Sequence, residues 1–388
     1  MNTENLFESM SKKILITGGA GFIGTNLALT LIKSGYEVTV LDNLSKQIHG
    51  EFPEQTSELY QSIKGKVNFI EGDVTCKEDW LKSINDNNII VHLAAETGTG
   101  QSMYQIKKYT DVNIGGTALM LELLSSIDHV VKKVVIASSR AIYGEGKYFS
   151  ASLGNVYPES RSIEKMSSGY FEVTMTGVSE ELKLVPTDEE SKIHPTSVYG
   201  ITKQNQEQMV MTVCPALHIA PVAFRYQNVY GPGQSLQNPY TGILSIFSTQ
   251  IKNNKPINIF EDGKESRDFV FIDDVVSATI AGIEQENANG QVFNVGTGVA
   301  TTVMEVATQL IKNYGIEVPV QVTGNFRIGD IRHNCADISK IKKLLNFSPK
   351  VNFEEGIKRF TDWVSTQEIM ASQYDQSLNE MKSKGLMK

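Results

Sequence analysis

Hydrophobic and polar residues follow two different periods near the start of the chain. Residues 14–17 form a short, nearly continuous apolar run, which is typical of a strand buried on both faces of a parallel sheet. Apolar residues then recur at helical spacing from Phe22 until Gly35, and a second apolar run at 37–41 ends at Asp42. The pattern predicts a strand, a glycine turn, a helix and a second strand, in that order.

The same alternation of strand and helix patterns continues to residue 226. Apolar runs predict further strands at 66–74, 88–95, 131–139 and 220–226, and helical spacing predicts long helices at 104–127 and 197–213. Strands that alternate with helices indicate an α/β fold with a doubly wound parallel sheet of the Rossmann type. Such sheets bind their ligands at the carboxyl ends of the strands.

The C-terminal part of the chain predicts shorter elements. Helices are expected at 243–252, from 273, from Thr302 to Lys312 and at 353–364, and strands at 257–260 and 291–298. We therefore expect a Rossmann domain over 11–226 with an insertion at 144–190, a smaller, discontinuous C-terminal substrate-binding lobe over 227–365 from which about 270–296 returns to the Rossmann domain, and a tail over 366–388. Tyr374, Leu378 and Met381 share one helical face, which predicts a weakly docked or frayed helix.

The turn between the first strand and the first helix carries residue types that bind a dinucleotide. Gly18 and Gly21 let the backbone turn tightly and approach a pyrophosphate, while Gly24 lets the helix pack closely on the strand. Unpaired amides and the positive dipole end at the helix start attract phosphates. Asp42 stands where a carboxylate would hydrogen-bond the adenosine ribose, which favours NAD over NADP. An NADP-dependent chain with Lys46 as the phosphate partner is the alternative.

Other residues expected near the cofactor lie at the helix start and at the strand ends. Asp73 and Val74 would lie beside the adenine, although a turn aspartate after a strand explains Asp73 equally well. Small residues at the end of the strand at 88–95 would let the cofactor lie across the strand ends. The cofactor set from these patterns is Gly18, Gly21, Phe22, Ile23, Gly24, Asp42, Asn43, Asp73, Val74, Leu93, Ala94 and Ala95.

Composition and charge narrow the class of protein. The chain has 388 residues, of which 40% are hydrophobic and 21% charged, and its net charge of −8 leaves no basic footprint for nucleic acid. No stretch approaches the roughly 20 apolar residues of a membrane span, and Cys76, Cys214 and Cys335 are scattered without metal-site spacing. We therefore expect a cytoplasmic protein without disulfides or a metal site, whose residues 1–10 are a tag or a disordered lead.

Candidate chemistry is carried by Ser139, at the end of a predicted strand, and by Tyr199 and Lys203, which lie one helical turn apart. A tyrosine alone is a poor base because its pKa is near 10, but a nearby ammonium and the positive nicotinamide ring would favour the phenolate. A shift of about 3 units corresponds to roughly 4 kcal/mol. Ser139 could share the substrate oxygen with Tyr199, and Lys203 could hold the nicotinamide ribose. A Tyr-x-x-x-Lys pair alone is more often a solvated helix surface, so the inference depends on the dinucleotide unit before it.

Several ordered motifs connect these features to a known family. They include TGGAGFIG, HLAAE, NIGGT, SSRAIYG, YGITK, RYQNVYGPG, SRDFVFIDDV and GDIRHNCADISK. From about Lys12 to about Val364 the chain resembles the extended short-chain dehydrogenases/reductases of the nucleotide-sugar epimerase and dehydratase group. This resemblance implies NAD as the cofactor, a nucleotide sugar as the substrate, and a homodimer formed through the helices at 104–127 and 197–213.

The resemblance also assigns roles to individual residues. It implies catalytic roles for Ser139, Tyr199 and Lys203, NAD contacts for Asn113, Ala94, Ala95, Tyr199 and Lys203, and contacts to the nucleotide diphosphate for Asn228, Arg267 and Arg327. Arginine suits the last task because its guanidinium can grip two phosphate oxygens, although a surface ion pair is the alternative for each arginine. Arg225, close to a strand end, is more consistent with a structural role.

The residues after Ser139 narrow the reaction within the family. Related 4,6-dehydratases carry an Asp-Glu pair there, whereas this chain has Arg140 and Ala141, and it has no cysteine in the loop where 3,5-epimerising relatives carry one. The remaining reaction is a 4-epimerisation, in which Tyr199 takes a hydroxyl proton, NAD takes and returns a hydride, and the keto-sugar turns over in between. The motifs resemble most the branch that interconverts dTDP-L-rhamnose and dTDP-6-deoxy-L-talose. The alternatives are another nucleotide-sugar epimerase, a net NAD-dependent oxidoreductase of the family, or a non-catalytic scaffold, which the intact catalytic set disfavours.

The insertion at 144–190 is the main departure from the family pattern. Members of that branch often carry cysteine pairs here that resemble a zinc ribbon, but no cysteine lies between Cys76 and Cys214 in this chain. We therefore expect hairpin packing to replace a metal, and we expect the insertion to form a surface subdomain that borders the sugar pocket.

Overall fold

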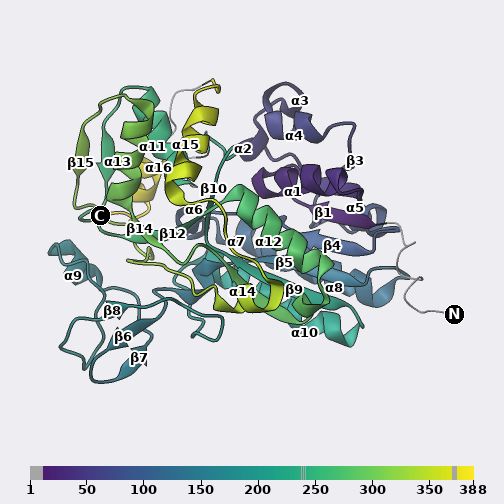
Figure 1. The fold of residues 1–388 in the computed structure, drawn as a ribbon, viewed down its shortest axis with the longest axis horizontal. Helices are drawn as coiled ribbons and strands as arrows, with labels where there is room; N and C mark the ends of the chain where they lie inside the picture. The colour runs from purple at the N-terminus through teal and green to yellow at the C-terminus, as the bar shows by residue number, and fades with distance from the viewer. Residues whose placement is uncertain (1–11, 237, 239, 241, 369–373) are drawn as a thin grey trace.

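The structure is a computed structural model that describes residues 12–236, 238, 240, 242–368 and 374–388 (Figure 1). The expectation for residues 1–10 lies outside the described residues. Alternating strands and helices build a central parallel sheet, beside which lie a smaller lobe and a protruding subdomain.

Seven parallel strands form the central sheet in the order β13-β9-β5-β4-β1-β2-β3. They are β1 (Lys13–Thr17), β2 (Glu37–Asp42), β3 (Asn68–Glu71), β4 (Ile89–His92), β5 (Lys133–Ser139), β9 (Ala220–Tyr226) and β13 (Gln291–Val295). From β1 the chain first adds β2 and β3 on one side of the sheet and then β4, β5, β9 and β13 on the other side. The order of the strands therefore reverses at β1, and ligands bind at such a switch point. The sheet confirms the predicted doubly wound α/β fold, and β13 joins it from far along the chain.

Helices cover both faces of this sheet and divide its apolar residues between two cores. One face carries α1 (Phe22–Lys33), α4 (Glu58–Ile63) and α12 (Ile272–Glu284), and the other carries α5 (Lys77–Ile84), α8 (Gly116–Ser126) and α10 (Val198–Ala216). Successive residues of β1 alternate between the cores, since Ile14 and Ile16 belong to the first and Leu15 to the second. Because both faces are buried, the strand is apolar throughout.

The helix predicted at 104–127 is interrupted near its start. It consists of α7 (Ile106–Tyr109), a π-helical segment η2 (Thr110–Gly115) and α8. Such segments are rare, and in this one the buried amide of Asn113 bonds the backbone of Glu96 and the hydroxyl of Thr202. Apolar periodicity predicts the helix but does not reveal a widened turn inside it.

The smaller lobe follows β9 and contains two short sheets. Its strands are β10 (Asn228–Tyr230), β12 (Ser266–Phe271) and β14 (Ala300–Thr302) in one sheet, and β11 (Ile257–Ile259) and β15 (Val320–Val322) in the other. Its helices are α11 (Ile243–Lys252), α13 (Val303–Tyr314) and α15 (Phe353–Val364), while α14 (Ser339–Leu345) packs on β13 of the central sheet. The predicted bounds of α11 and α15 are confirmed, and Thr302 caps α13 through a capping box with Glu305.

Short elements connect these units. They are α2 (Lys46–His49), α3 (Pro53–Thr56), α6 (Thr99–Ser102), and the 3-10 turns η3 (Arg140–Tyr143) and η4 (Glu286–Ala288). The elements η3 and α6 lie at the carboxyl ends of β5 and β4, where they follow the strands into the cleft described below.

The insertion forms a small subdomain at the lower left of Figure 1. Its elements are β6 (Tyr148–Ser150), β7 (Gly154–Val156), α9 (Ile163–Ser167) and β8 (Lys183–Leu184), of which the strands pair in the order β7-β6-β8. Two buried arginines join it to the smaller lobe. Arg161 of the insertion bonds both carboxylate oxygens of Glu261, and Arg332 of the lobe bonds Glu172 of the insertion. These ion pairs hold the subdomain in place.

The tail docks more firmly than its sequence predicts. In α16 (Tyr374–Ser383), Tyr374, Ser377 and Met381 are at most 5% exposed. Residues 386–388 then pair with residues 326–328 through backbone hydrogen bonds. The expectation of a weakly docked or frayed helix is therefore wrong.

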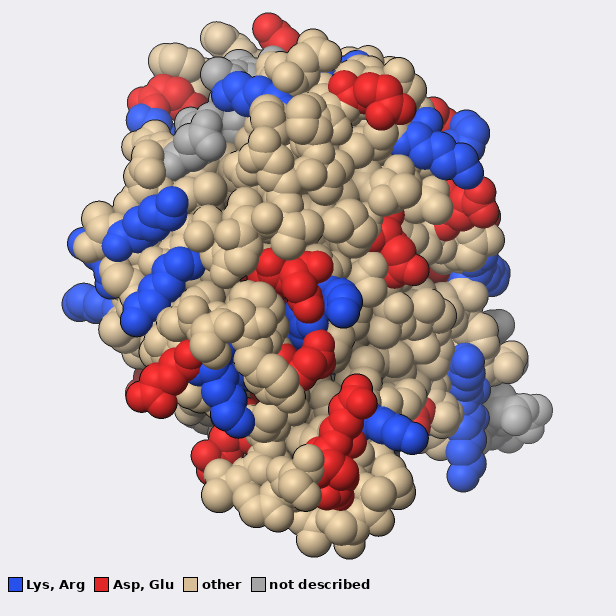
Figure 2. Space-filling view, turned by 90° about the vertical axis from the view of Figure 1, so that its left-hand side faces the viewer, with Lys and Arg blue, Asp and Glu red and all other residues tan. Residues whose placement is uncertain are grey.

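The surface carries charges of both signs. Figure 2 shows acidic and basic side chains interspersed over one face of the molecule. Within the described ranges, no helix combines the length and apolar character needed to cross a membrane, and no group of three or more His, Cys, Asp or Glu side chains is arranged to hold a metal ion.

Candidate active site

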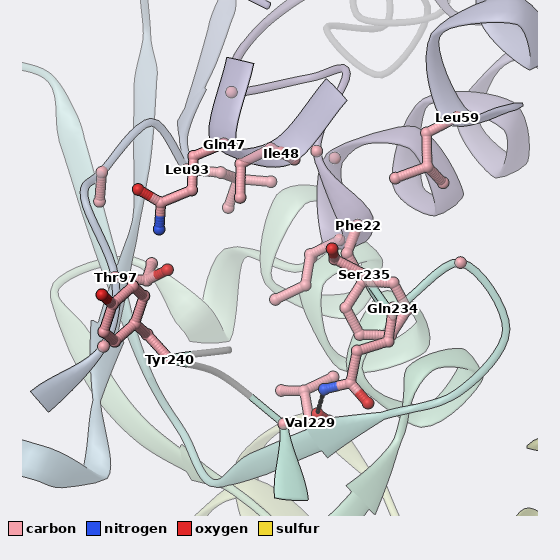
Figure 3. Close-up of a pocket in the computed structure, with 18 of the residues that line it drawn as sticks. Phe22, Gln47, Ile48, Leu59, Leu93, Thr97, Val229, Gln234, Ser235 and Tyr240 are labelled. Atoms are coloured by element: carbon pink, nitrogen blue, oxygen red, sulfur yellow. Dashed lines mark hydrogen bonds between the residues drawn. The ribbon is translucent and has the colours of Figure 1, made fainter. Parts of the chain in front are cut away.

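A cleft of about 960 Å³ lies where the carboxyl ends of β1, β2, β4 and β5 face the smaller lobe. Figure 3 shows both walls, with Phe22 and Leu59 from the Rossmann side, Val229 from β10, and Gln234 and Tyr240 from the segment that follows β10. Ligand pockets usually measure about 300–1,000 Å³, so this cleft is at the large end of the range. It has room for more than one small ligand.

The glycine turn lines one end of the cleft, and two of its glycines have no space for a side chain. A Cβ atom at Gly18 would lie 2.8 Å from the amide nitrogen of Ala94, and Gly18 also has a φ of +67°. A Cβ atom at Gly24 would lie 2.3 Å from the carbonyl oxygen of Gly18. Gly18, Gly21 and Gly24 thus line the cleft without side chains at the start of α1, which is the arrangement that the sequence predicts for a dinucleotide.

Asp42 lines the cleft at the end of β2, and backbone amides fix the position of its carboxylate. One oxygen accepts the amide of Ala20 and the other the amide of Leu44, each at 2.9 Å, and the ring of His49 lies 3.8 Å away. Burial raises the pKa of Asp42, while His49 and the backbone amides act in the opposite direction. Lys46, the alternative partner for a 2′-phosphate, forms an exposed ion pair with Glu51.

Most of the predicted site residues line this single cleft. They are Gly18, Gly21, Phe22, Ile23, Gly24, Asp42, Asn43, Val74, Leu93, Ala94, Ala95, Ser139, Tyr199, Lys203, Asn228, Arg267 and Arg327. Asp73 and Asn113 are predicted site residues that do not line the cleft. Asp73 accepts hydrogen bonds from Asn43 and Thr75, while its neighbour Val74 lines the cleft. Cofactor contacts by Asp73 and Asn113 stay predictions.

Ser139 and Tyr199 are hydrogen-bond partners at the end of β5. The Ser139 hydroxyl accepts the amide of Ala141 at 3.1 Å, which leaves its own proton free to donate. Burial raises the pKa of Tyr199, and the hydrogen bond with Ser139 and the charge of Arg140 lower it. The Tyr199 amide donates to the hydroxyl of Ser102 at 3.0 Å, which fixes the start of α10 against α6.

Arg140 lines the cleft immediately after Ser139. Among the described residues we find no hydrogen bond or ion pair of its guanidinium. Burial, followed by the like charge of Arg267, lowers its pKa to about 10. Arg140 is thus a protein cation that lowers the pKa of the Tyr199 phenol. The expectation that Lys203 favours the phenolate stays a prediction.

Lys203 is a buried residue in the cleft wall, and a polar network holds its ammonium. Its ammonium donates to the carbonyl of Ala137 at 2.8 Å and to the side chain of Gln206 at 2.9 Å. Gln206 donates to the hydroxyl of Thr117 at 2.7 Å, which lies 2.9 Å from the ring of His92. Burial lowers the pKa of Lys203 to about 7. Sequence reasoning missed this network, although the spacing of Gln206 three residues after Lys203 was an available signal.

The three residues assigned to the diphosphate differ in how the protein holds them. Arg267 is ordered by Asp330, whose carboxylate it contacts at 2.8 Å. The guanidinium of Arg327 lies 4.8 Å from the ring centre of Phe260, and its Nε is buried without a described partner. The side-chain oxygen of Asn228 is likewise buried without a described partner. Orphaned polar atoms beside a cleft are expected where a ligand completes the hydrogen bonds.

Arg225 has the structural role that its sequence position predicts. It is 3% exposed, binds both carboxylate oxygens of Glu207 and donates to the hydroxyl of Tyr143 at 2.7 Å. This pair ties β9 to α10, the helix that carries Tyr199 and Lys203.

Comparisons with known proteins agree with this geometry. A sequence model of the NAD dependent epimerase/dehydratase family matches residues 14–296. A dTDP-L-rhamnose 4-epimerase from Burkholderia thailandensis is 36% identical over 359 residues, which cover 92% of this chain and 96% of that protein. A UDP-glucuronate 4-epimerase from Thermodesulfobacterium geofontis is 32% identical over 90% of this chain and 95% of that protein. The crystal structure of a UDP-glucuronic acid 4-epimerase from Bacillus cereus, in complex with UDP-glucuronic acid and NAD, has a TM-score of 0.74 at 28% identity and covers 91% of this chain and 99% of that chain.

Proposed function

The chain belongs to the NAD dependent epimerase/dehydratase family and has NAD as its cofactor, and from this premise we propose that it inverts C4 of a nucleotide-activated deoxysugar. The proposed substrate is dTDP-L-rhamnose and the product is dTDP-6-deoxy-L-talose. The relative from Burkholderia thailandensis, which carries that substrate in its name, supports this choice.

One observation carries the proposal. Ser139, Tyr199 and Lys203 line the same cleft as the glycine turn, although they come from different parts of the chain. The turn leaves the space that a pyrophosphate needs, and the carboxylate of Asp42 lies at the end of β2 where an adenosine ribose would bind. The residues present therefore fit NAD at one end of the cleft and a sugar beside Tyr199.

In the proposed reaction the protein residues move and hold protons. NAD, when bound, supplies the acceptor and donor for a hydride. The phenol oxygen of Tyr199 accepts the proton of the sugar 4-hydroxyl and returns it after the keto-sugar has turned over. Ser139 donates a hydrogen bond to the same sugar oxygen, and Lys203 holds the ribose hydroxyls next to the nicotinamide.

The residues after Ser139 favour epimerisation over elimination. Arg140 and Ala141 occupy η3, directly beside the catalytic hydroxyl. A 4,6-elimination needs an acid and a base for carbons 5 and 6, and neither a guanidinium nor a methyl group can supply them at neutral pH. A reaction that needs only one proton transfer and a reversible hydride transfer remains.

A second candidate substrate class is a nucleotide uronic acid. The observation that favours it is Arg140, a cation in the cleft wall for which we find no hydrogen bond or ion pair among the described residues. A sugar carboxylate would pair with a guanidinium through two hydrogen bonds. The 32% identical relative named as a UDP-glucuronate 4-epimerase is consistent with this alternative.

The test is a substrate panel in which no NAD is added. Purified protein is incubated with dTDP-L-rhamnose, UDP-glucuronate or UDP-glucose, and the sugars are identified by NMR. We expect the C4 epimer of dTDP-L-rhamnose to form and, in D₂O, to keep its C4 hydrogen because the hydride returns to the same carbon. Deuterium at C4, or turnover that requires stoichiometric NAD, would contradict the mechanism. Turnover of UDP-glucuronate alone would select the second candidate.

We also propose a homodimer formed through α7 and α10, because each presents an exposed isoleucine. Ile106 is 53% exposed and Ile201 is 45% exposed. We expect Ile201→Asp to lower the mass measured by light scattering to that of one chain. Ile163→Asp, at an exposed isoleucine of the insertion, is the control that leaves the mass unchanged. An unchanged mass for Ile201→Asp would contradict the proposed interface.

A further inference from the structure

The tail contacts the substrate lobe by main-chain pairing beside Arg327. The amide of Phe326 donates to the carbonyl of Lys388 at 2.8 Å, and the amide of Lys388 donates back to Phe326 at 3.1 Å. The amide of Ile328 donates to the carbonyl of Leu386 at 3.0 Å. Arg327 is therefore the central residue of a short antiparallel pair, opposite Met387.

The same tail contacts the other side of the cleft through α16. Glu380 accepts a hydrogen bond at 2.6 Å from the hydroxyl of Tyr240, which lines the cleft. The sulfur of Met381 lies so close to Gly100 in α6 that a Cβ there would be 3.1 Å away. The ring of Tyr374 lines the cleft itself. The tail thus connects the loop after β4 with the segment that carries Arg327.

The opposite side of the Arg327 segment is also packed. Phe326 is 3% exposed and its ring lies 6.5 Å from that of Phe171 in the insertion, in an edge-on arrangement. With the insertion on one side and the tail on the other, the backbone at Arg327 has little freedom. A long side chain loses less entropy on binding phosphate when its backbone is already fixed.

We propose that residues 374–388 are a positioning element of the substrate site, which holds Arg327 toward the nucleotide diphosphate and holds Tyr240 in the cleft wall. The role of Arg327 in this statement rests on the proposed function. The contacts of residues 374–388 described above are with residues 326–328, with Tyr240 and with Gly100, so we expect their effect to fall on the nucleotide sugar and to leave NAD binding unchanged.

The first test is the deletion of residues 385–388, which removes the main-chain pairing with 326–328. We expect KM for the nucleotide sugar, and the dissociation constant of dTDP or UDP measured by calorimetry, to rise about tenfold, while kcat and the NAD content of the purified protein stay within about twofold. The exposed Lys382→Ala in α16 is the control that changes neither constant.

A double-mutant cycle separates positioning from general destabilisation. If the tail acts through Arg327, the deletion has no further effect on nucleotide affinity in an Arg327→Ala background. Additive effects, or a loss of NAD from the deletion variant, would overturn the proposal. Calorimetry with dTDP and UDP keeps the test valid if neither nucleotide sugar is turned over, because that result would contradict only the proposed reaction.

A single-atom comparison decides the matter if the deletion variant does not fold. Lys388→Pro removes the amide that donates to Phe326, whereas Lys388→Ala removes the same exposed side chain and keeps the amide. We expect nucleotide affinity to fall several-fold for the proline variant and to stay unchanged for the alanine variant. Equal affinities for the two variants would refute the role of the pairing.

Discussion

Gly24 gives the sharpest test of the cofactor site, because a single methyl group there displaces the phosphate-binding turn. Gly24 is buried in the first turn of α1. The added Cβ of Gly24→Ala would lie 2.3 Å from the carbonyl oxygen of Gly18 and 2.6 Å from the Cα of Gly19. The same Gly18 oxygen accepts the amide of Gly21 at 3.2 Å. The turn and the helix must therefore move apart.

Two effects of opposite sign determine the size of the change. Alanine is favoured over glycine inside a helix by about 1 kcal/mol. Carbon atoms in contact normally lie about 3.5–4.0 Å apart, so a separation of 2.6 Å forces a movement of about 1 Å, and overpacking of this kind costs about 1–3 kcal/mol. Stability then falls by no more than about 2 kcal/mol. Phosphate binding depends on the position of the turn, and we expect NAD affinity to fall at least about tenfold.

The assay is the NAD content of purified protein together with calorimetric titration of NAD. Gly115→Ala is the matched control, since Gly115 is exposed in η2 and an added Cβ would lie 3.8 Å from the nearest atom, the carbonyl oxygen of Thr110. We expect that variant to bind NAD like the parent. If Gly24→Ala retained the parent affinity, the glycine turn would not be the pyrophosphate site.

Three further predictions concern the catalytic phenol and two buried charges. Tyr199→Phe should lower kcat about 10²–10⁴-fold while NAD content is unchanged, as measured by turnover of the epimerised sugar; full activity would exclude Tyr199 as the acid and base. Arg225→Met should destabilise the protein by about 3–5 kcal/mol in urea unfolding, because it leaves Glu207 buried and unpaired, and a change below 1 kcal/mol would contradict this. Burial raises the pKa of Glu265 from 4.5 to about 7. Between these two pH values the folded protein binds a proton at Glu265 that the unfolded chain does not bind. The free energy of unfolding therefore increases as the pH falls through this range. The stability of the parent relative to Glu265→Gln should therefore rise by about 2–3 kcal/mol between pH 8 and pH 5, and an equal difference at both pH values would refute the shift.

The elements that the sequence predicts best are those whose residues are buried on both sides. In β1, Ile14, Leu15 and Ile16 pack into two different cores, so the apolar run itself identifies the strand. The bounds of α15 were also predictable, because Asn352 caps its first turn and its apolar face is regular. Local composition fixes such elements without knowledge of their partners.

The polar part of the site was only partly predictable, because it depends on which distant residues meet. The spacing of Tyr199 and Lys203 predicts that they share a helix face, but it does not show that Lys203 is held by Ala137 and Gln206. The same spacing does not show that Arg140, at the end of another strand, also acts on the phenol. Which cations lie near the phenol is decided by tertiary structure.

The insertion and the tail show the same limit for whole segments. None of the described residues of the insertion lines the cleft, but Arg161 donates to the backbone carbonyl of Asp330, which does, so the expectation that the insertion borders the sugar pocket stays a prediction. The insertion packs on Phe326 through the ring of Phe171. The backbone of Phe326 also exchanges two hydrogen bonds with the backbone of Lys388 in the tail. Two segments without a family motif thus enclose the one segment that carries Arg327. Because each contact joins residues more than 50 positions apart through the backbone or a single ring, periodicity within either segment could not reveal it. The backbone that carries Arg327, and with it the contact that we propose to a diphosphate, is therefore held by parts of the chain that the motifs leave out.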